Sequence, residues 1–66
     1  MDPIEVKRIK LDVLRREHGD LDGAIMALEA QSSGDAFTIK RLKKKKLHLK
    51  DRIRILQDQI NPDIIA

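Results

Sequence analysis

The sequence predicts an all-α protein, a coiled-coil-like antiparallel hairpin of two helices that dimerises into a four-helix assembly. Apolar residues recur at steps of three and four along two long segments, and turn residues separate these segments. Of the 66 residues, 38% are charged and 2% are aromatic, as is typical of solvated helices. We expect one domain over residues 1–66, with helices at about 3–30 and 36–60, a loop at about 31–35 and a short tail at 61–66.

The first helix begins with a capping signal. Asp2 can accept a hydrogen bond from the backbone, Pro3 suits the first helical position, and Glu5 can reach back to Asp2, which together form a capping box. Residues at heptad spacing then form one face, which we call the seam. Its members in this helix are Ile4, Leu11, Leu14, His18, Leu21, Ile25 and Leu28.

The segment around Gly19 allows an alternative. Cations at Arg15 and Arg16, then Gly19 and Asp20, also fit a helix that stops and a new helix that starts. Because the heptad spacing continues through this segment without a skip, we favour one helix, with a kink near Gly19 as a variant of it.

The second helix follows a loop of residues 31–35 (Gln-Ser-Ser-Gly-Asp), whose serines are explained as turn or capping residues, and ends at Asn61-Pro62 because proline cannot continue the helix. Its seam residues are Ile39, Leu42, Lys46, Leu49, Ile53, Leu56 and Ile60. A short loop forces the helices antiparallel, so residues whose numbers sum to about 67 should face each other.

Three polar residues belong to this seam or border it: His18, Asp22 and Lys46. In the expected register Lys46 lies opposite Leu21 and next to Asp22. Its aliphatic stem can cover the leucine while its ammonium reaches the carboxylate. We therefore assign these three residues a structural role, in which a polar seam position helps to fix register.

Two segments carry a family resemblance. Residues 18–29 (HGDLDGAIMALE) and 42–53 (LKKKKLHLKDRI) resemble the two conserved segments of the YdcH-like family, which consists of short bacterial proteins of unknown function. This resemblance implies a helical hairpin that self-associates, and it implies no catalytic activity. The chain departs from the family pattern at Lys45 and Arg52, where the family often has acids.

Composition excludes several function classes. There is no cysteine, hence no disulfide and no thiolate metal site, and no run of about 18 apolar residues that could span a membrane. The N-terminal residues do not resemble a secretory signal. We expect a soluble cytoplasmic protein that is not an enzyme, has no catalytic residues and binds no cofactor, because two helices offer no pocket in which polar groups converge.

The two histidines allow a metal-site hypothesis, since His18 and His48 face each other in the register with Asp22 and Asp51 nearby. Neither helix contains a His-x3-His pair, however. We favour a seam histidine and an exposed one, with no metal.

Charge is segregated along the chain. Residues 40–54 contain nine basic residues and one acid, a net charge of +8, whereas the remainder has five basic and ten acidic residues, a net of −5. One hypothesis is weak, sequence-independent binding of nucleic acid or another polyanion. Its candidate contacts are Lys40, Arg41, Lys43, Lys44, Lys45 and Lys50. We prefer a solvated face, because consecutive lysines point in different directions around a helix and Phe37 is the only aromatic residue.

Apolar residues off the seam point to a partner. Val6, Ile9 and Val13 in the first helix and Ile55 in the second cannot be buried inside the hairpin. The tail, with Ile64 and Ile65, could fold back over them, but one short tail cannot cover both helices. We therefore expect a homodimer or higher homo-oligomer built on Val6, Ile9, Val13 and Ile55. Docking of this assembly on another cytoplasmic protein is a further hypothesis.

Overall fold

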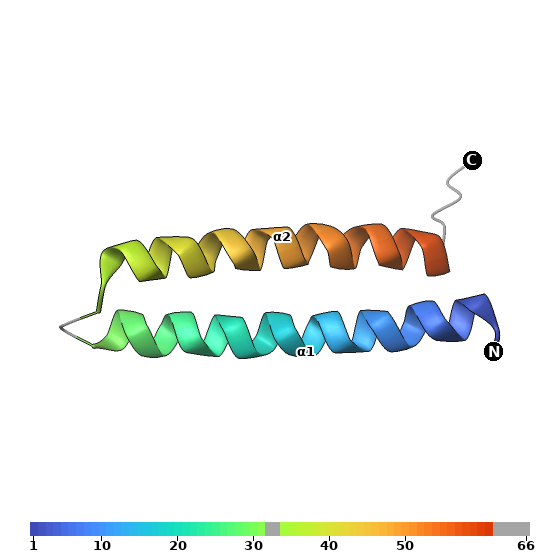
Figure 1. Cartoon of the computed structure of the whole chain (residues 1–66), viewed down its shortest axis with the longest axis horizontal. Helices are drawn as coiled ribbons and strands as arrows, with labels where there is room; N and C mark the ends of the chain where they lie inside the picture. Colours follow the sequence, from blue (N-terminus) through green and yellow to red (C-terminus); the bar gives the residue numbers. More distant parts are fainter. Residues whose placement is uncertain (32–33, 62–66) are drawn as a thin grey trace.

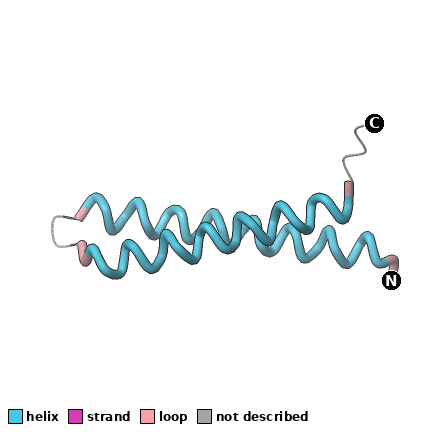
Figure 2. The backbone as a smooth tube through the Cα atoms, turned by 90° about the horizontal axis from the view of Figure 1, so that it is seen from above, coloured by secondary structure: helices cyan, strands magenta, loops and turns pink. Residues whose placement is uncertain are grey.

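The computed structural model describes residues 1–31 and 34–61, which form two helices, α1 (Pro3–Ala30) and α2 (Ala36–Ile60). The helices run antiparallel and side by side, so the start of α1 and the end of α2 lie together at what we call the open end (Figure 1). Seen from above, they cross near their middle and are therefore inclined to each other (Figure 2). The prediction of an all-α fold made of two packed helices is confirmed.

The caps of α1 explain its limits. Asp2 Oδ1 accepts a hydrogen bond of 3.0 Å from the backbone N–H of Ile4, and Pro3 occupies the first helical position. The reciprocal bond from Glu5 to Asp2 is absent from the described part of the chain, so only half of the predicted capping box forms. At the other end the N–H of Gln31 donates to the carbonyl of Leu28 at 3.2 Å.

Gly19 lies inside a continuous α1. None of the described glycines has a positive φ, so the left-handed stop that the sequence also allowed does not form. A Cβ added at Gly19 or at Gly23 would meet open space, and neither glycine is required by packing in the hairpin. The heptad spacing was therefore a better guide to this segment than the local stop signal.

The start of α2 is held by Asp35. Its Oδ1 accepts from the N–H of Phe37 at 3.0 Å, and its Oδ2 accepts from the hydroxyl of Thr38 at 2.8 Å. Gly34 precedes this cap, and its N–H donates to the carbonyl of Gln31 at 3.1 Å. A Cβ at Gly34 would collide with the carbonyl oxygen of Leu28 and crowd that of Gln31, so the turn needs glycine here. The roles expected for Ser32, Ser33, Pro62, Ile64 and Ile65 fall outside the described residues.

The seam forms as the spacing predicts. All fourteen of its positions are buried or half-buried, and Lys7 continues it between Ile4 and Leu11. Full burial is nevertheless confined to three side chains of α1, Leu11, Leu14 and Ile25, and no described residue of α2 is buried. One hairpin therefore withdraws little apolar surface from water, which limits the hydrophobic stabilisation that it can gain alone.

Candidate interaction surface

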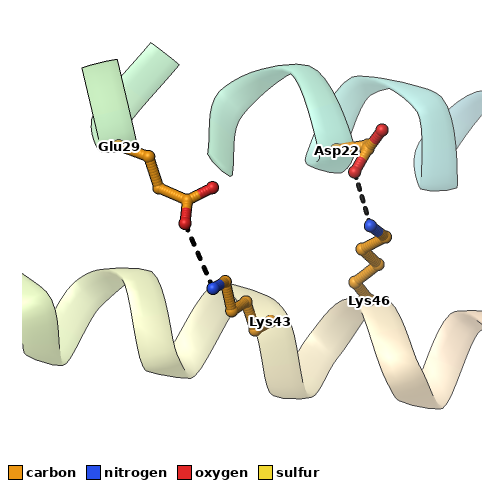
Figure 3. Close-up of polar contacts among 4 residues, drawn as sticks. All are labelled: Asp22, Glu29, Lys43 and Lys46. Carbon is orange, nitrogen blue, oxygen red and sulfur yellow. Dashed lines mark hydrogen bonds and ion pairs between the residues drawn. The ribbon is translucent and has the colours of Figure 1, made fainter. Parts of the chain in front are cut away.

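One side of the hairpin carries two ion pairs between the helices (Figure 3). Lys46 Nζ lies 2.5 Å from Asp22 Oδ1, and both side chains are more than a third exposed. The hydrogen bond and charge of Lys46 lower the pKa of the Asp22 carboxyl. This is the partner that the register predicted for Lys46. The pair also shows which residues of α1 and α2 lie at the same height along the long axis of the hairpin, and we call such residues level.

The second ion pair joins Lys43 Nζ to Glu29 Oε2 at 3.1 Å. Sequence reasoning missed this pair, although the signal was present. In an antiparallel hairpin, residues that follow a seam position on both helices flank the same side, and Glu29 follows Leu28 as Lys43 follows Leu42. We call the side that contains Asp22, Glu29, Lys43 and Lys46 the ion-pair face. The exposed side chains of Met26 and Leu47 border the same hollow.

His18 lies in the seam, half-buried, and its Nε2 atom is buried without a hydrogen-bond partner among the described residues. His48 lies on the exposed flank of α2. Within residues 1–31 and 34–61, no three His, Asp or Glu side chains lie close enough together to hold a metal ion.

The side of the hairpin opposite the ion-pair face contains a groove of about 530 Å³ between the helices. We call this side the groove face. Leu21, Ala24 and Leu49 form the apolar part of the lining. The charged residues at its edges segregate by helix: the acids Glu17 and Asp20 come from α1, whereas the basic residues Lys45 and Arg52 come from α2, as does the imidazole of His48. Sequence reasoning did not single out this set of residues, because its members are scattered along the chain.

The predicted self-association residues gather toward the open end. Ile9, Val13 and Ile55 are 54%, 48% and 54% exposed, whereas Val6 is half-buried. Val13 precedes Glu17 by four residues, and Ile55 follows Arg52 by three, so helical periodicity places both on the groove face. Ile9 lies next to Val6 and Val13 on α1, at the border of this face. The structure thus brings Val13 and Ile55 to the same side and the same end of the hairpin.

The polyanion candidates are spread around α2. All six are exposed, but Lys43 is engaged with Glu29. Lys50 points to the same side as Lys43, Lys45 borders the groove, and Lys44 lies between these directions on the outer surface of α2. The lysine run therefore presents charge on several sides of the helix and does not form a single stripe.

Neither described helix is long and apolar enough to cross a membrane. The family model described as "Protein of unknown function (DUF465)" matches residues 11–57, most of the chain. The YdcH-like proteins belong to that family, so the resemblance found in the two segments is confirmed. No curated protein and no solved structure matches the chain.

Proposed function

The chain belongs to the DUF465 family of proteins of unknown function, and from this premise we propose that it is a non-catalytic, cytoplasmic interaction protein whose first partner is a second copy of itself. The observation that carries the proposal is the imbalance between buried and exposed apolar side chains. Among residues 1–31 and 34–61 three apolar side chains are buried, whereas Ile9, Val13 and Ile55 are about half exposed at one end of the hairpin.

The energetics favour covering this apolar surface. Fully burying a valine or isoleucine side chain is worth about 1.5–3 kcal/mol, and each residue in a twofold-symmetric interface is used twice. Partial burial of Val13 and Ile55 in both copies would therefore contribute several kcal/mol toward association. A chain of this size, with no cysteine and few buried residues, commonly obtains missing stability from a partner.

The test is the molecular mass in solution, measured by sedimentation over a wide concentration range. The parent chain is expected to associate, and Val13→Asp is expected to shift the association to at least about tenfold higher concentration, because it places two carboxylates in the contact.

Two control variants locate the effect. Met26→Asp changes a more exposed apolar residue on the ion-pair face, and Lys44→Asp reverses a charge on the outer surface of α2. Both are expected to leave association intact. A parent that stays monomeric at every concentration, or an association that is lost in Lys44→Asp and kept in Val13→Asp, would refute the proposal.

A second candidate function is weak polyanion binding through α2. The observation behind it is that Lys40, Arg41, Lys44 and Lys45 form no ion pair with the described residues. Such binding is expected to be independent of sequence and to weaken steeply with salt, since it depends on counterion release. Titration with duplex and single-stranded DNA at two salt concentrations tests it. Tight binding to one sequence that survives high salt would contradict this form of the hypothesis.

A further inference from the structure

We propose that two copies associate through their groove faces about a twofold axis parallel to the helices, so that α1 of each copy lies along α2 of the other. The inference rests on the self-association proposed above and adds its geometry. Three features support it. Apolar residues of α1 and α2 on the groove face lie at the same height, acids and basic residues on this face belong to different helices, and the ion-pair face lacks such a match.

The register sets which residues meet. The ion pair shows that Asp22 and Lys46, whose numbers sum to 68, lie level across the hairpin. Val13 and Ile55 have the same sum and so also lie level. A rotation about an axis parallel to the helices keeps every residue at its level and exchanges the two helices across the interface. Val13 of one copy then faces Ile55 of the other, and this happens twice.

The charges of the groove face match in the same arrangement. Asp20 of α1 lies level with His48 of α2, and Glu17 and Ala24 lie within one residue of the levels of Arg52 and Lys45. Stacking α1 on the partner's α2 therefore puts Glu17 over an arginine, Asp20 over an imidazole and a small residue over a lysine stem. Opposite charges that face each other across an interface favour this partner and this register over others.

Other arrangements bring like charges together. A twofold axis perpendicular to the helices would stack α1 on α1 and α2 on α2, which places the basic residues of the two copies against each other. On the ion-pair face the acids Asp22 and Glu29 are already engaged within the chain. Arg15 and Arg54 on that side lie within one residue of the same level, so stacking through the ion-pair face would set arginine close to arginine.

Disulfide trapping tests the geometry, and the chain has no cysteine of its own. Val13→Cys and Ile55→Cys are made as separate variants, mixed, allowed to exchange and mildly oxidised, and the products are identified by mass. The mixed disulfide is expected to form at least about tenfold faster than either homodisulfide, because only the mixed pair comes within bridging distance. Homodisulfides that form as fast as the mixed product would overturn the arrangement.

Met26→Cys and Lys43→Cys provide the matched control, since both positions are exposed, lie on the ion-pair face and are within one residue of the same level. Their mixture is expected to show no preference for the mixed disulfide. Circular dichroism of each variant confirms that the helices are retained. A parent that sediments as a monomer refutes self-association itself, whereas a dimer that cross-links through the Met26 and Lys43 variants refutes only the groove-face geometry.

Charge exchange gives an independent measurement. Glu17→Arg alone and Arg52→Glu alone each place like charges across the interface, so each is expected to associate less than the parent. An equal mixture is expected to recover association, because each variant supplies the charge that the other lacks. Pairing between residues 17 and 52 within one copy would give no recovery on mixing, and that result would count against the groove-face contact.

Discussion

Lys46 shows how one polar residue is accommodated in the seam. Its stem lies between the helices, and its ammonium leaves the seam to reach Asp22. Because both partners are more than a third exposed, water competes with the ion pair and its contribution to stability is small. The value of Lys46 therefore lies in fixing the register of the two helices more than in stabilising them.

Replacing Lys46 with leucine is expected to stabilise the hairpin. Lys46→Leu extends the apolar seam, and the gain from partial burial, about 1 kcal/mol, exceeds the loss of a half-exposed ion pair. Thermal unfolding followed by circular dichroism measures the change. Lys43→Leu, at an exposed ion pair off the seam, is the control and should give no gain. A lower midpoint for Lys46→Leu would show that the ion pair matters more than the seam.

Acid is expected to destabilise the hairpin through two aspartates. The hydrogen bond from Lys46 lowers the pKa of Asp22, and those from the Thr38 hydroxyl and the Phe37 N–H lower that of Asp35. A carboxyl with a lowered folded pKa stabilises the fold above its unfolded pKa, about 3.9, and this contribution disappears as the pH falls through the folded value.

Helicity measured between neutral pH and pH 2 checks this expectation. The parent should lose helicity below about pH 4, and Asp22→Asn combined with Asp35→Asn should lose less over the same interval. Asparagine retains a capping oxygen at position 35, so the comparison isolates the charge. An identical acid transition in parent and double variant would exclude these two carboxyls as its source.

At the scale of the element, Gly34 and Gly23 have different surroundings. Gly34 lies in the turn, where a Cβ would collide with the carbonyl oxygen of Leu28, whereas a Cβ at Gly23 inside α1 would meet open space. Gly34→Ala is expected to destabilise the hairpin by distorting the turn. Gly23→Ala is expected to stabilise it by about 0.5–1 kcal/mol, because alanine is the better helix former.

Urea unfolding of the two glycine variants beside the parent measures the change in the free energy of unfolding, which should fall for Gly34→Ala and rise for Gly23→Ala. The pair is informative because the chemical change is the same and only the surroundings differ. Equal effects at both positions would mean that the turn does not depend on Gly34.

The helices were largely predictable from the sequence, and the reasons are local. The start of α1 is predicted by Asp2 with Pro3, and its continuity by the heptad spacing through Gly19. Neither signal needs tertiary information. Side-chain geometry was less predictable: Glu5 fits a capping box, yet it does not bond to Asp2. The pair of Glu29 with Lys43 and the groove between α1 and α2 depend on two distant segments at once, so they appear only when the register is known.

At the scale of the whole molecule, stability and association are expected to be linked. If the second copy supplies the missing burial, the thermal midpoint should rise with protein concentration, since association stabilises only the folded chain. Unfolding at concentrations spanning about a hundredfold measures this directly. Val13→Asp serves as the control, because its midpoint should depend less on concentration. A parent midpoint that stays constant would indicate that the hairpin is stable alone.

The single short connection between α1 and α2 also has a kinetic consequence. Leu28 and Ile39 are close along the chain, whereas Ile4 and Ile60 are separated by nearly all of it. Contacts between the helices are therefore expected to form first near the loop and then progressively toward the open end. The open end then closes last and frays first. Val13 and Ile55 lie toward that end, so a partner bound there would hold the two helix ends together and lower the rate at which the whole hairpin opens.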